Sequence, residues 1–409
     1  MNARLNPTAL ALLCLVALAV TELTHCAKLV QVQVISRHGD RTPLGQLPNN
    51  PVVWPEGEGQ LTGEGMMQTN KLGQLLRKRY SGKLLSPSYV PKEAYFRSSD
   101  IDRTLMSAEC VLLGVYPPGT GPIVNNQPAL PFGIQPVPIH TIPRPNEIYL
   151  LGENYCPTYN QRLQKEYQTK EWQTLLKNNA EFLAYLSNVT GASVSLPKFY
   201  DIYDSLYVLS VHHKLTLNIS EETLRRVEDL ANTVESINHR WDVLGNLGAS
   251  PLINETLYHM NKVISGDADA KKYIHWSGHD VTLLSVASAY QLDRYYSKFN
   301  IIPTYASAFA LELYQDDDGD NPTYSVRLLF KLGNETDFTP YVVPGCSDTL
   351  CSMDVYTKAV KTNAIVGDSI LDWCKECGNY FAEACRPDDS RSWVSNTAPQ
   401  IGVLGSFRE

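Results

Sequence analysis

The sequence predicts an α/β fold, in which a mostly parallel sheet is flanked by helices and a smaller helical cap domain is inserted. The first observation is a strand at 29–36, with alternating valine and glutamine, that precedes a loop and a helix at 63–80. The second is a repeat of this strand, loop and helix order at 272–290. The third is a long helical stretch at 143–265 that has few strand signals. One sheet interrupted by a helical insertion accounts for all three observations.

The N-terminal residues have the pattern of a secretory signal peptide. Arg4 precedes an apolar run at 9–20, and small residues follow it up to Cys26, after which cleavage is expected. This run is short for a membrane span, and no later segment has the required run of about 20 apolar residues. The predicted segments are a signal peptide at 1–26, the first part of an α/β core domain at 27–142, a helical cap domain at 143–265, the second part of the α/β core domain at 266–386 and a polar C-terminal tail at 387–409.

Composition and charge limit the classes of partner. The 409 residues are 43% hydrophobic, which is enough for a large buried core and two domains. The formal net charge of −8 argues against nucleic acid as a partner and favours small anionic substrates at a local positive site. The signal peptide implies a secreted or lumenal product, in which Asn-x-Ser/Thr sequences are glycosylation acceptors. The four acceptors are Asn188, Asn218, Asn254 and Asn334.

The most informative motif is Arg37–Pro43, which has the form R-H-G-x-R-x-P and directly follows the first predicted strand. Gly39 is expected to let the backbone turn sharply there. Arg37 and Arg41 can hold phosphoryl oxygens, and their charges lower the pKa of His38, which leaves a ring nitrogen free to attack phosphorus. A chance match has a probability on the order of 10⁻⁴ in a chain of ordinary composition. The motif therefore predicts a nucleophile for phosphoryl transfer.

The alternatives for this motif are a basic surface loop and a metal site. His38 and Asp40 are both possible metal ligands, but two neighbouring arginines repel a divalent cation. We therefore expect neither a metal nor another cofactor at this loop.

A second loop follows the predicted strand at 272–277. In open α/β sheets the ligand lies at the carboxyl ends of the strands, so His279 and Asp280 are expected to face His38. A departing alkoxide needs a proton, which Asp280 can supply if a bound phosphate dianion raises the pKa of its carboxyl group. An acidic activity optimum is the expected consequence. Protonated His279 would donate to phosphoryl oxygens. A His-Asp pair alone is common, and its significance depends on the first motif.

Arg103 is a third candidate for the phosphate clamp. It begins a helical stretch that follows the segment Arg97–Asp102. The alternative is a helix-surface residue that pairs with Asp100 or Asp102, and the spacing alone leaves both possibilities open.

Cysteines are expected to form disulfides in an oxidising compartment. The Cys374-x-x-Cys377 spacing is also that of half a zinc site, but no second half with His or Cys at ligand spacing is present. Cys110 is left over in an apolar run, and we expect a buried free thiol there. The six disulfide candidates are Cys156, Cys346, Cys351, Cys374, Cys377 and Cys385.

Two further polar clusters are assigned no ligand. The segment Asp316–Asp320 lacks the glycine and glutamate of an EF-hand loop, so a hairpin turn is expected between strands at 308–314 and 323–330. His212 and His213 have no partner visible in the sequence and are expected on the surface of the cap domain.

Taken together, the chain resembles the histidine acid phosphatases, especially the animal prostatic and lysosomal type. The resemblance extends from Leu29 to Cys377, and a series of motifs in the family's order makes it highly specific. It implies a phosphoglycerate-mutase-like arrangement of sheet and helices. The motifs are Arg37–Pro43, Trp54–Thr62, Arg97–Ala108, Tyr155–Pro157, Ser277–Thr282 and Pro344–Cys346.

The resemblance implies a phosphohistidine mechanism without a metal. The family's nucleophile falls on His38 and its proton donor on Asp280. It also makes Arg103 a member of the phosphate clamp, against the alternative of surface pairing. The family's phosphate-binding positions are Arg37, Arg41, Arg103 and His279. The bridges that it implies are Cys156 with Cys374 and Cys346 with Cys351, and extrapolation adds Cys377 with Cys385.

Three functions are compatible with these residues. The main hypothesis is a secreted acid phosphatase that acts on small phosphomonoesters. A homodimeric enzyme is compatible with this hypothesis. The lysosomal branch carries a membrane anchor near its C-terminus, which is not found here, so a freely soluble form is expected. A phytase-like enzyme shares the same motifs, and residues at 143–265 should decide the substrate. A secreted phosphate-binding protein is the third hypothesis, although a pure binder needs neither a nucleophile nor an acid.

Overall fold

The computed structural model describes residues 27–316 and 322–386. The predicted signal peptide at 1–26, the polar tail at 387–409 and the turn residues 317–321 lie outside the described residues.

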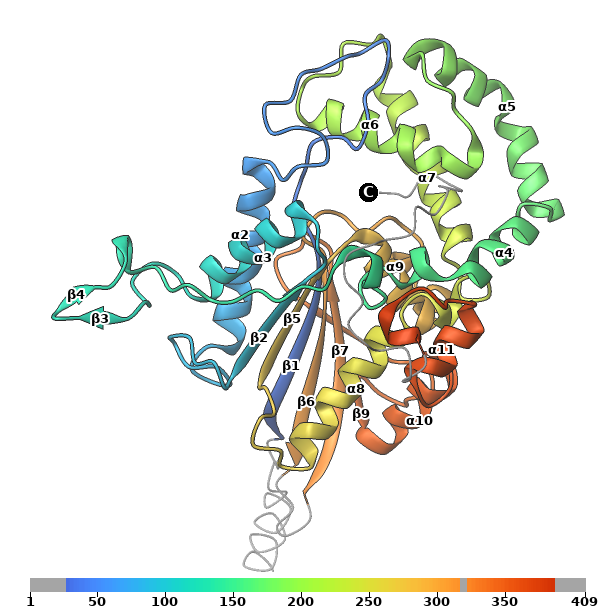
Figure 1. Cartoon of the computed structure of the whole chain (residues 1–409). Coiled ribbons are helices and arrows are strands. Elements are labelled where there is room, and N and C mark those ends of the chain that lie inside the picture. Colours follow the sequence, from blue (N-terminus) through green and yellow to red (C-terminus); the bar gives the residue numbers. More distant parts are fainter. Residues whose placement is uncertain (1–26, 317–321, 387–409) are drawn as a thin grey trace, which may run out of the picture.

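A seven-stranded sheet forms the centre of the molecule (Figure 1). Its first three strands are parallel, and the others join antiparallel. The α/β architecture is therefore confirmed, but the sheet is mixed and not mostly parallel. Strands Ala308–Asp316 and Thr323–Lys331 pair antiparallel, as the expected hairpin requires, because the short link between them has no room for the crossover of a parallel pair. The strand order is β2 (Ala94–Ser98), β5 (Tyr273–Gly278), β1 (Lys28–Arg37), β6 (Ala308–Asp316), β7 (Thr323–Lys331) and β8 (Thr339–Tyr341), with β9 (Leu350–Ser352) also beside β7.

Helices cover both faces of this sheet (Figure 1). The side chains of β1 alternate: Val32 and Val34 pack in the cluster that contains α2 and α3, while Ile35 packs in the cluster that contains α8 and α9. Gln33 reaches the same side as Ile35, where its amide donates to the Thr256 carbonyl of α8. The covering helices are α2 (Gly63–Tyr80), α3 (Asp102–Val115), α8 (Ser250–Ile264), α9 (Asp280–Ala289) and α10 (Met353–Asn363). Helix α11 (Ile370–Cys377) packs in a separate cluster that contains Cys156 and Leu247.

The inserted helices have a hydrophobic core of their own. Trp172, Leu186, Leu206 and Val234 are buried in it, away from the sheet. Helix α8, which the sequence places in the cap domain, instead packs on the sheet through its apolar residues. This places the helix in the core layer, because its apolar stripe is covered by strand side chains. The inserted helices are α4 (Pro157–Glu166), α5 (Lys170–Thr190), α6 (Phe199–Val211) and α7 (Glu221–Asn238).

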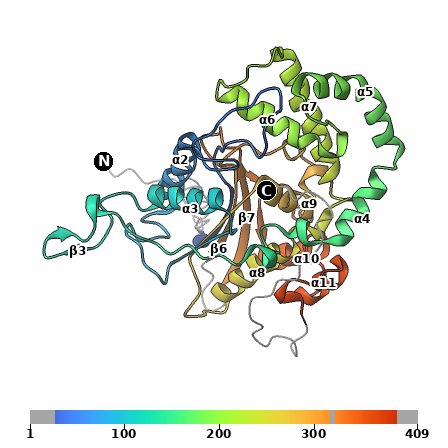
Figure 2. The ribbon, with the colours of Figure 1, turned by 45° about the horizontal axis from the view of Figure 1, so that its top comes forward.

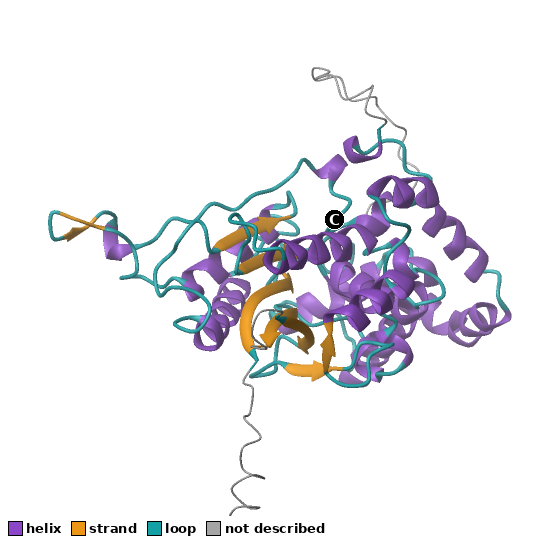
Figure 3. Cartoon of the chain, turned by 90° about the horizontal axis from the view of Figure 1, so that it is seen from below, coloured by secondary structure: helices purple, strands orange, loops and turns teal. Residues whose placement is uncertain are grey.

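The chain segment that connects α3 to the inserted helices forms a thin arm, which projects from the body on the side of α2 and α3 (Figures 1, 2 and 3). It contains the small hairpin of β3 (Ile123–Val124) and β4 (Gln127–Pro128). Its apolar side chains are largely uncovered, and Phe132 is 83% exposed.

Two of the three expected disulfide pairings are wrong. Cys346 bridges Cys351 as implied, but Cys156 bridges Cys377, and Cys374 bridges Cys385. The physical reason is the end of α11 at Gly378, which has φ 66° and reverses the chain. The chain then runs back along the helix, so Cys385 meets Cys374, one turn before the helix end. Cys110 is free but only partly buried.

Candidate active site

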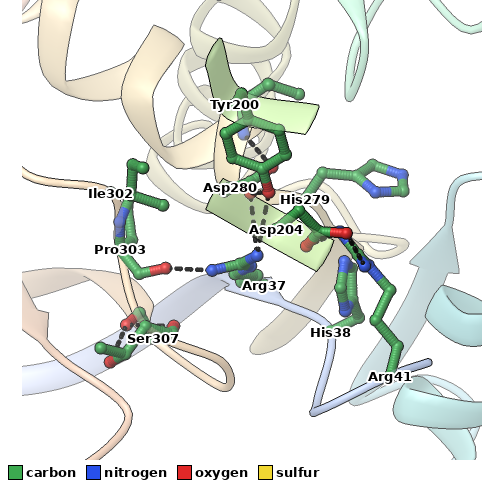
Figure 4. A network of polar contacts seen from close by, with 12 residues as sticks. Arg37, His38, Arg41, Tyr200, Asp204, His279, Asp280, Ile302, Pro303 and Ser307 are labelled. Carbon is green, nitrogen blue, oxygen red and sulfur yellow. Dashed lines mark hydrogen bonds and ion pairs between the residues drawn. The ribbon is translucent and has the colours of Figure 1, made fainter. Parts of the chain in front are cut away.

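The two predicted loops meet at the carboxyl ends of adjacent parallel strands. Arg37 of β1 pairs in register with Gly278 of β5, and the His38 amide donates to the Gly278 carbonyl at 3.0 Å. The rings of His38 and His279 have their centroids 5.6 Å apart. The expected convergence of the two loops is confirmed, and Figure 4 shows their side chains together.

Gly39 is required by close packing against α2. A Cβ atom at this position would lie 2.2 Å from the Gly65 carbonyl oxygen in the first turn of that helix. The φ angle of Gly39 is not in the left-handed region, so the predicted reason, a sharp turn, is replaced by close approach. The Gly39 amide also donates to the Ser107 hydroxyl of α3 at 3.1 Å. Two helices thus hold the loop that carries His38.

The hydrogen bond of His38 defines which ring nitrogen is reactive. Its Nδ1 lies 2.7 Å from the Gly39 carbonyl oxygen, which can only accept, so Nδ1 carries the proton. Nε2 therefore keeps its lone pair. Burial, followed by the charges of Arg103 and Arg37, holds the pKa of His38 well below its usual value. The imidazole is neutral and chemically suited to attack an electrophile through Nε2.

Three buried arginines surround this ring, and two of them are paired with carboxylates. Arg37 lies 2.8 Å from Asp280, and Arg41 forms two contacts of 2.9 Å with Asp204. Arg103 is only 5% exposed, yet it forms no ion pair within the described part of the chain. Burial and the neighbouring Arg41 lower the pKa of Arg103 to about 10.

The unsatisfied N–H donors of these arginines favour an anion. The Nε atoms of all three arginines are buried and have no hydrogen-bond partner among the described residues. A buried unpaired donor is costly, and an oxyanion would satisfy several of them at once. The alternative in which Arg103 pairs with Asp100 or Asp102 on the helix surface is not what the structure shows.

Asp280 is the first residue of α9 and is held as a carboxylate in the absence of a ligand. Burial raises the pKa of its carboxyl group, but the Arg37 charge and a hydrogen bond from Tyr200 bring it below the usual value. The Tyr200 hydroxyl donates to Oδ2 at 2.5 Å, and the Val281 amide donates to Oδ1 at 2.8 Å. Figure 4 shows Tyr200 above Asp280 and Arg37. Proton donation by Asp280 therefore requires that another group first compete for Arg37.

His279 has both ring nitrogens engaged. Its side chain accepts the Thr282 amide as the cap of α9, and its Nε2 lies 2.8 Å from the Ser99 hydroxyl. Burial and the Arg103 charge lower the pKa of His279 well below its usual value. The lowered pKa favours a neutral ring in the ligand-free site, and the donor role of a protonated His279 stays an expectation for the complex with phosphate.

The inserted helix α6 supplies residues that sequence reasoning missed. Tyr200 and Asp204 are four residues apart and therefore on one face of this helix, which reaches down to Asp280 and Arg41. At the helix end, His212 Nε2 lies 2.8 Å from Oδ2 of Asp40. The prediction that His212 is a surface residue without a partner is wrong. The spacing of Tyr200 and Asp204 was the available signal, but it does not say where the helix points.

A cavity of about 370 Å³ lies between these groups. Its polar wall carries the reactive groups, and its apolar wall consists of side chains from four segments of the chain. Outside the lining, the Tyr305 ring centroid lies 4.4 Å from the Arg37 guanidinium carbon and 5.8 Å from the ring centroid of His38. The lining residues are His38, Arg41, Leu44, Ile101, Arg103, Leu151, Tyr200, His279, Asp280 and Val281.

A neutral histidine, an anion site of three arginines and a carboxyl group at one sheet edge define an enzyme that handles phosphoryl groups. The Histidine phosphatase superfamily (branch 2) matches residues 28–331, which is most of the chain. The chain belongs to this family and is a phosphatase.

Curated relatives agree with this assignment. The chain is 34% identical to lysosomal acid phosphatase of Homo sapiens, covering 88% of this chain and 83% of the relative. It is also 34% identical to prostatic acid phosphatase of Homo sapiens, covering 85% of this chain and 87% of the relative.

Solved structures show the same fold at low sequence identity. The apo form of Hafnia alvei phytase has a TM-score of 0.60 and 15% identity, covering 82% of this chain and 97% of that one. Multiple inositol polyphosphate phosphatase of Bifidobacterium longum in complex with phosphate has a TM-score of 0.52 and 14% identity, with 86% and 96% covered.

Proposed function

We propose that this phosphatase hydrolyses phosphate monoesters through a phosphohistidine. His38 Nε2 attacks phosphorus, the bond to the alcohol oxygen breaks, and Asp280 gives its proton to that oxygen. Asp280 then removes a proton from water, whose oxygen displaces His38 and releases phosphate. The observation that carries the proposal is the Nδ1 hydrogen bond to Gly39, because it leaves Nε2 unprotonated. Arg37, Arg41 and Arg103 hold the phosphoryl oxygens.

Substrate binding prepares Asp280 for its role. Without a ligand, Arg37 holds this group as a carboxylate. A phosphate dianion competes for the same guanidinium and adds a nearby negative charge, and both changes raise the pKa of Asp280. The acid form is therefore favoured in the complex at low pH, and activity falls as the pH rises through that pKa.

The proposal is tested by hydrolysis of 4-nitrophenyl phosphate at about pH 5, which favours the protonated acid. We expect His38→Ala to lower kcat by about 10⁴- to 10⁶-fold, because no other group in the site replaces the nucleophile. EDTA should leave the wild-type rate unchanged. Full activity of His38→Ala would refute the nucleophile, and loss of activity in EDTA would restore the metal alternative.

A phytase-like specificity is the second candidate, favoured by the fold shared with the Hafnia alvei phytase. A phosphate-binding protein without turnover is disfavoured because the neutral His38 and the Asp280 carboxyl group line the same cavity. Comparison of the hydrolysis rates of inositol hexakisphosphate and simple monoesters distinguishes a phytase-like enzyme from an acid phosphatase. Phosphate release in a single-turnover assay would exclude the binding protein.

We also propose that the protein is made in the secretory pathway and reaches the extracellular space or the lysosomal lumen. The three disulfides support an oxidising compartment, and Asn188, Asn218 and Asn334 are exposed as glycan acceptors must be. Asn254 is half-buried in α8, which makes it the least accessible of the four. None of the described helices is long and apolar enough to cross a membrane.

A homodimer that forms through the projecting arm is proposed as well. Ile123, Val124, Leu130 and Phe132 are all exposed there, and a second copy would bury them. We expect Phe132→Asn to lower the mass measured by light scattering toward that of one chain, since asparagine tolerates the φ of 58° at this position. A monomeric wild-type protein would refute the proposal.

A further inference from the structure

An outer cleft of about 650 Å³ continues the phosphate cavity toward solvent. Leu44, Ile101 and Arg103 line both hollows, so the cleft opens directly from the phosphate site. When the phosphoryl group of a substrate is held against His38, this cleft is one path by which the alcohol portion of the substrate extends outward. The leaving group of the substrate is therefore exposed to the charges of the cleft.

The cleft carries more negative than positive charge. Its carboxylates are Glu58, Asp100 and Asp102, all of which are exposed. Its cations are Arg103 and the half-buried Arg144. Arg103 is 5% exposed, and its Nε has no hydrogen-bond partner among the described residues. Arg103 is therefore the cation of the cleft that remains for the phosphoryl group. The outer part of the cleft then has three carboxylates and one arginine.

This distribution separates two parts of a substrate. The inner cavity contains Arg103, which has no ion pair among the described residues, and attracts one phosphoryl group, while a second anionic group on the alcohol would meet the three carboxylates. Charges exposed to water interact weakly, and each such pair changes binding by about two- to five-fold. Several acting together give a selection that kinetics can measure.

We propose that the outer cleft binds the leaving group and selects monoesters whose alcohol carries a positive charge over neutral and polyanionic ones. The inference rests on the proposed phosphatase function and adds the substrate class to it. Amines or other cations on the alcohol would be placed near Glu58 and Asp100.

The test uses aryl phosphates of matched shape. The cationic probe is 4-(aminomethyl)phenyl phosphate, the neutral one is 4-ethylphenyl phosphate, and inositol hexakisphosphate is the polyanion. We expect kcat/KM to be at least about five-fold higher for the cationic probe than for the neutral one at low salt, and the ratio to fall as salt is added.

Variants assign the selection to the cleft. Glu58→Gln with Asp100→Asn should lower the ratio of kcat/KM between cationic and neutral probes by about five-fold. The matched control is Glu181→Gln with Asp354→Asn, which removes two exposed carboxylates outside both hollows and should keep the wild-type ratio. A ratio between probes of identical reacting groups does not respond to a general loss of folded protein.

The outcomes separate the inference from the function on which it rests. Hydrolysis of 4-nitrophenyl phosphate with a cationic-to-neutral ratio near one would overturn the inference and leave the phosphatase function intact. Equal ratios in the cleft variant, the control and the wild type would also overturn it. A wild-type protein that hydrolyses none of the aryl phosphates would overturn both, and preference for inositol hexakisphosphate would replace the inference with the phytase alternative.

Discussion

At the scale of single residues, each reactive group is prepared by specific partners. The Gly39 carbonyl selects the tautomer of His38, and Tyr200 with Arg37 sets the charge of Asp280. The partners are a main-chain carbonyl, a tyrosine hydroxyl and a guanidinium group, and Tyr200 and Arg37 are both buried. Preorganised groups of this kind stabilise charge without reorganisation during the reaction.

Tyr200→Phe should shift the pH dependence of kcat through its effect on the Asp280 carboxyl group. The Tyr200 hydroxyl favours the charged form of Asp280, so its removal raises the pKa of that group. The acid then stays protonated to higher pH, and the alkaline limb of the kcat profile should move up by about one unit, which corresponds to about 1.4 kcal/mol. The measurement is kcat against pH with an alkyl phosphate.

The control for this prediction is Tyr203→Phe, which removes a hydroxyl from the same helix but keeps the bond between Tyr200 and Asp280. An alkaline limb that stays in place in Tyr200→Phe would show that Tyr200 does not act through the carboxyl group.

At the scale of elements, helix α6 contacts the catalytic groups at three points. Tyr200 bonds Asp280, Asp204 pairs with Arg41, and His212 at its end contacts Asp40. The helix belongs to the insertion, whereas the groups it contacts belong to the sheet and its loops. The insertion therefore helps to position the catalytic loop in addition to covering it.

The His212 contact offers a direct test of this positioning. Asp40 lies within the R-H-G-x-R-x-P motif and also accepts a hydrogen bond from the Thr62 hydroxyl. We expect His212→Ala to lower kcat by about ten-fold, because a hydrogen bond to a charged group is worth about 1.5 to 3 kcal/mol and only part of it is lost from the transition state. KM and kcat are measured separately with 4-nitrophenyl phosphate.

His213→Asn is the matched control, since this exposed neighbour has a φ of 54° that asparagine tolerates. His212→Gln, which can still donate to Asp40, should recover part of the rate. Equal kcat in the wild type and in His212→Ala would contradict the positioning role.

At the scale of the whole molecule, one disulfide connects distant parts of the chain. Cys156 and Cys377 are 221 residues apart in sequence, while Cys346 and Cys351 are 5 apart. The bridge joins the start of α4 in the insertion to α11 of the core. A cross-link that closes a long loop restricts the unfolded chain more than one that closes a short loop.

Removal of the long-range bridge should therefore cost more stability. Cys156→Ser with Cys377→Ser is expected to lower the free energy of unfolding by about 4 to 5 kcal/mol, against about 2 kcal/mol for Cys346→Ser with Cys351→Ser. Urea titration of the two variants measures both values. A greater loss for the short bridge would mean that strain or local packing, and not loop closure, decides the contribution.

The convergence of the two candidate loops could be predicted from sequence because both lie at the ends of strands. Strand periodicity placed His38 and His279 after strands, and the general rule for ligand position brought the two loops together. Spacing alone left the role of Arg103 open, because its burial and the lack of an acidic partner among the described residues are properties of the packed chain. The antiparallel pairing of β1 with β6 was not predicted, because it depends on how strands far apart in sequence pack, whereas the hairpin of β6 and β7 was expected from the short link between them.

By itself, the sequence determined the α/β class, the nucleophile motif and the family, because these depend on local periodicity and on residues close together in the chain. Only the tertiary structure decided the contacts of α6 with Arg41 and Asp280, the neutral state of His279 and the partners of Cys374 and Cys377. These depend on distances between segments far apart in sequence, and on the burial that those distances create. Charge state and pairing are consequences of packing, which no single segment contains.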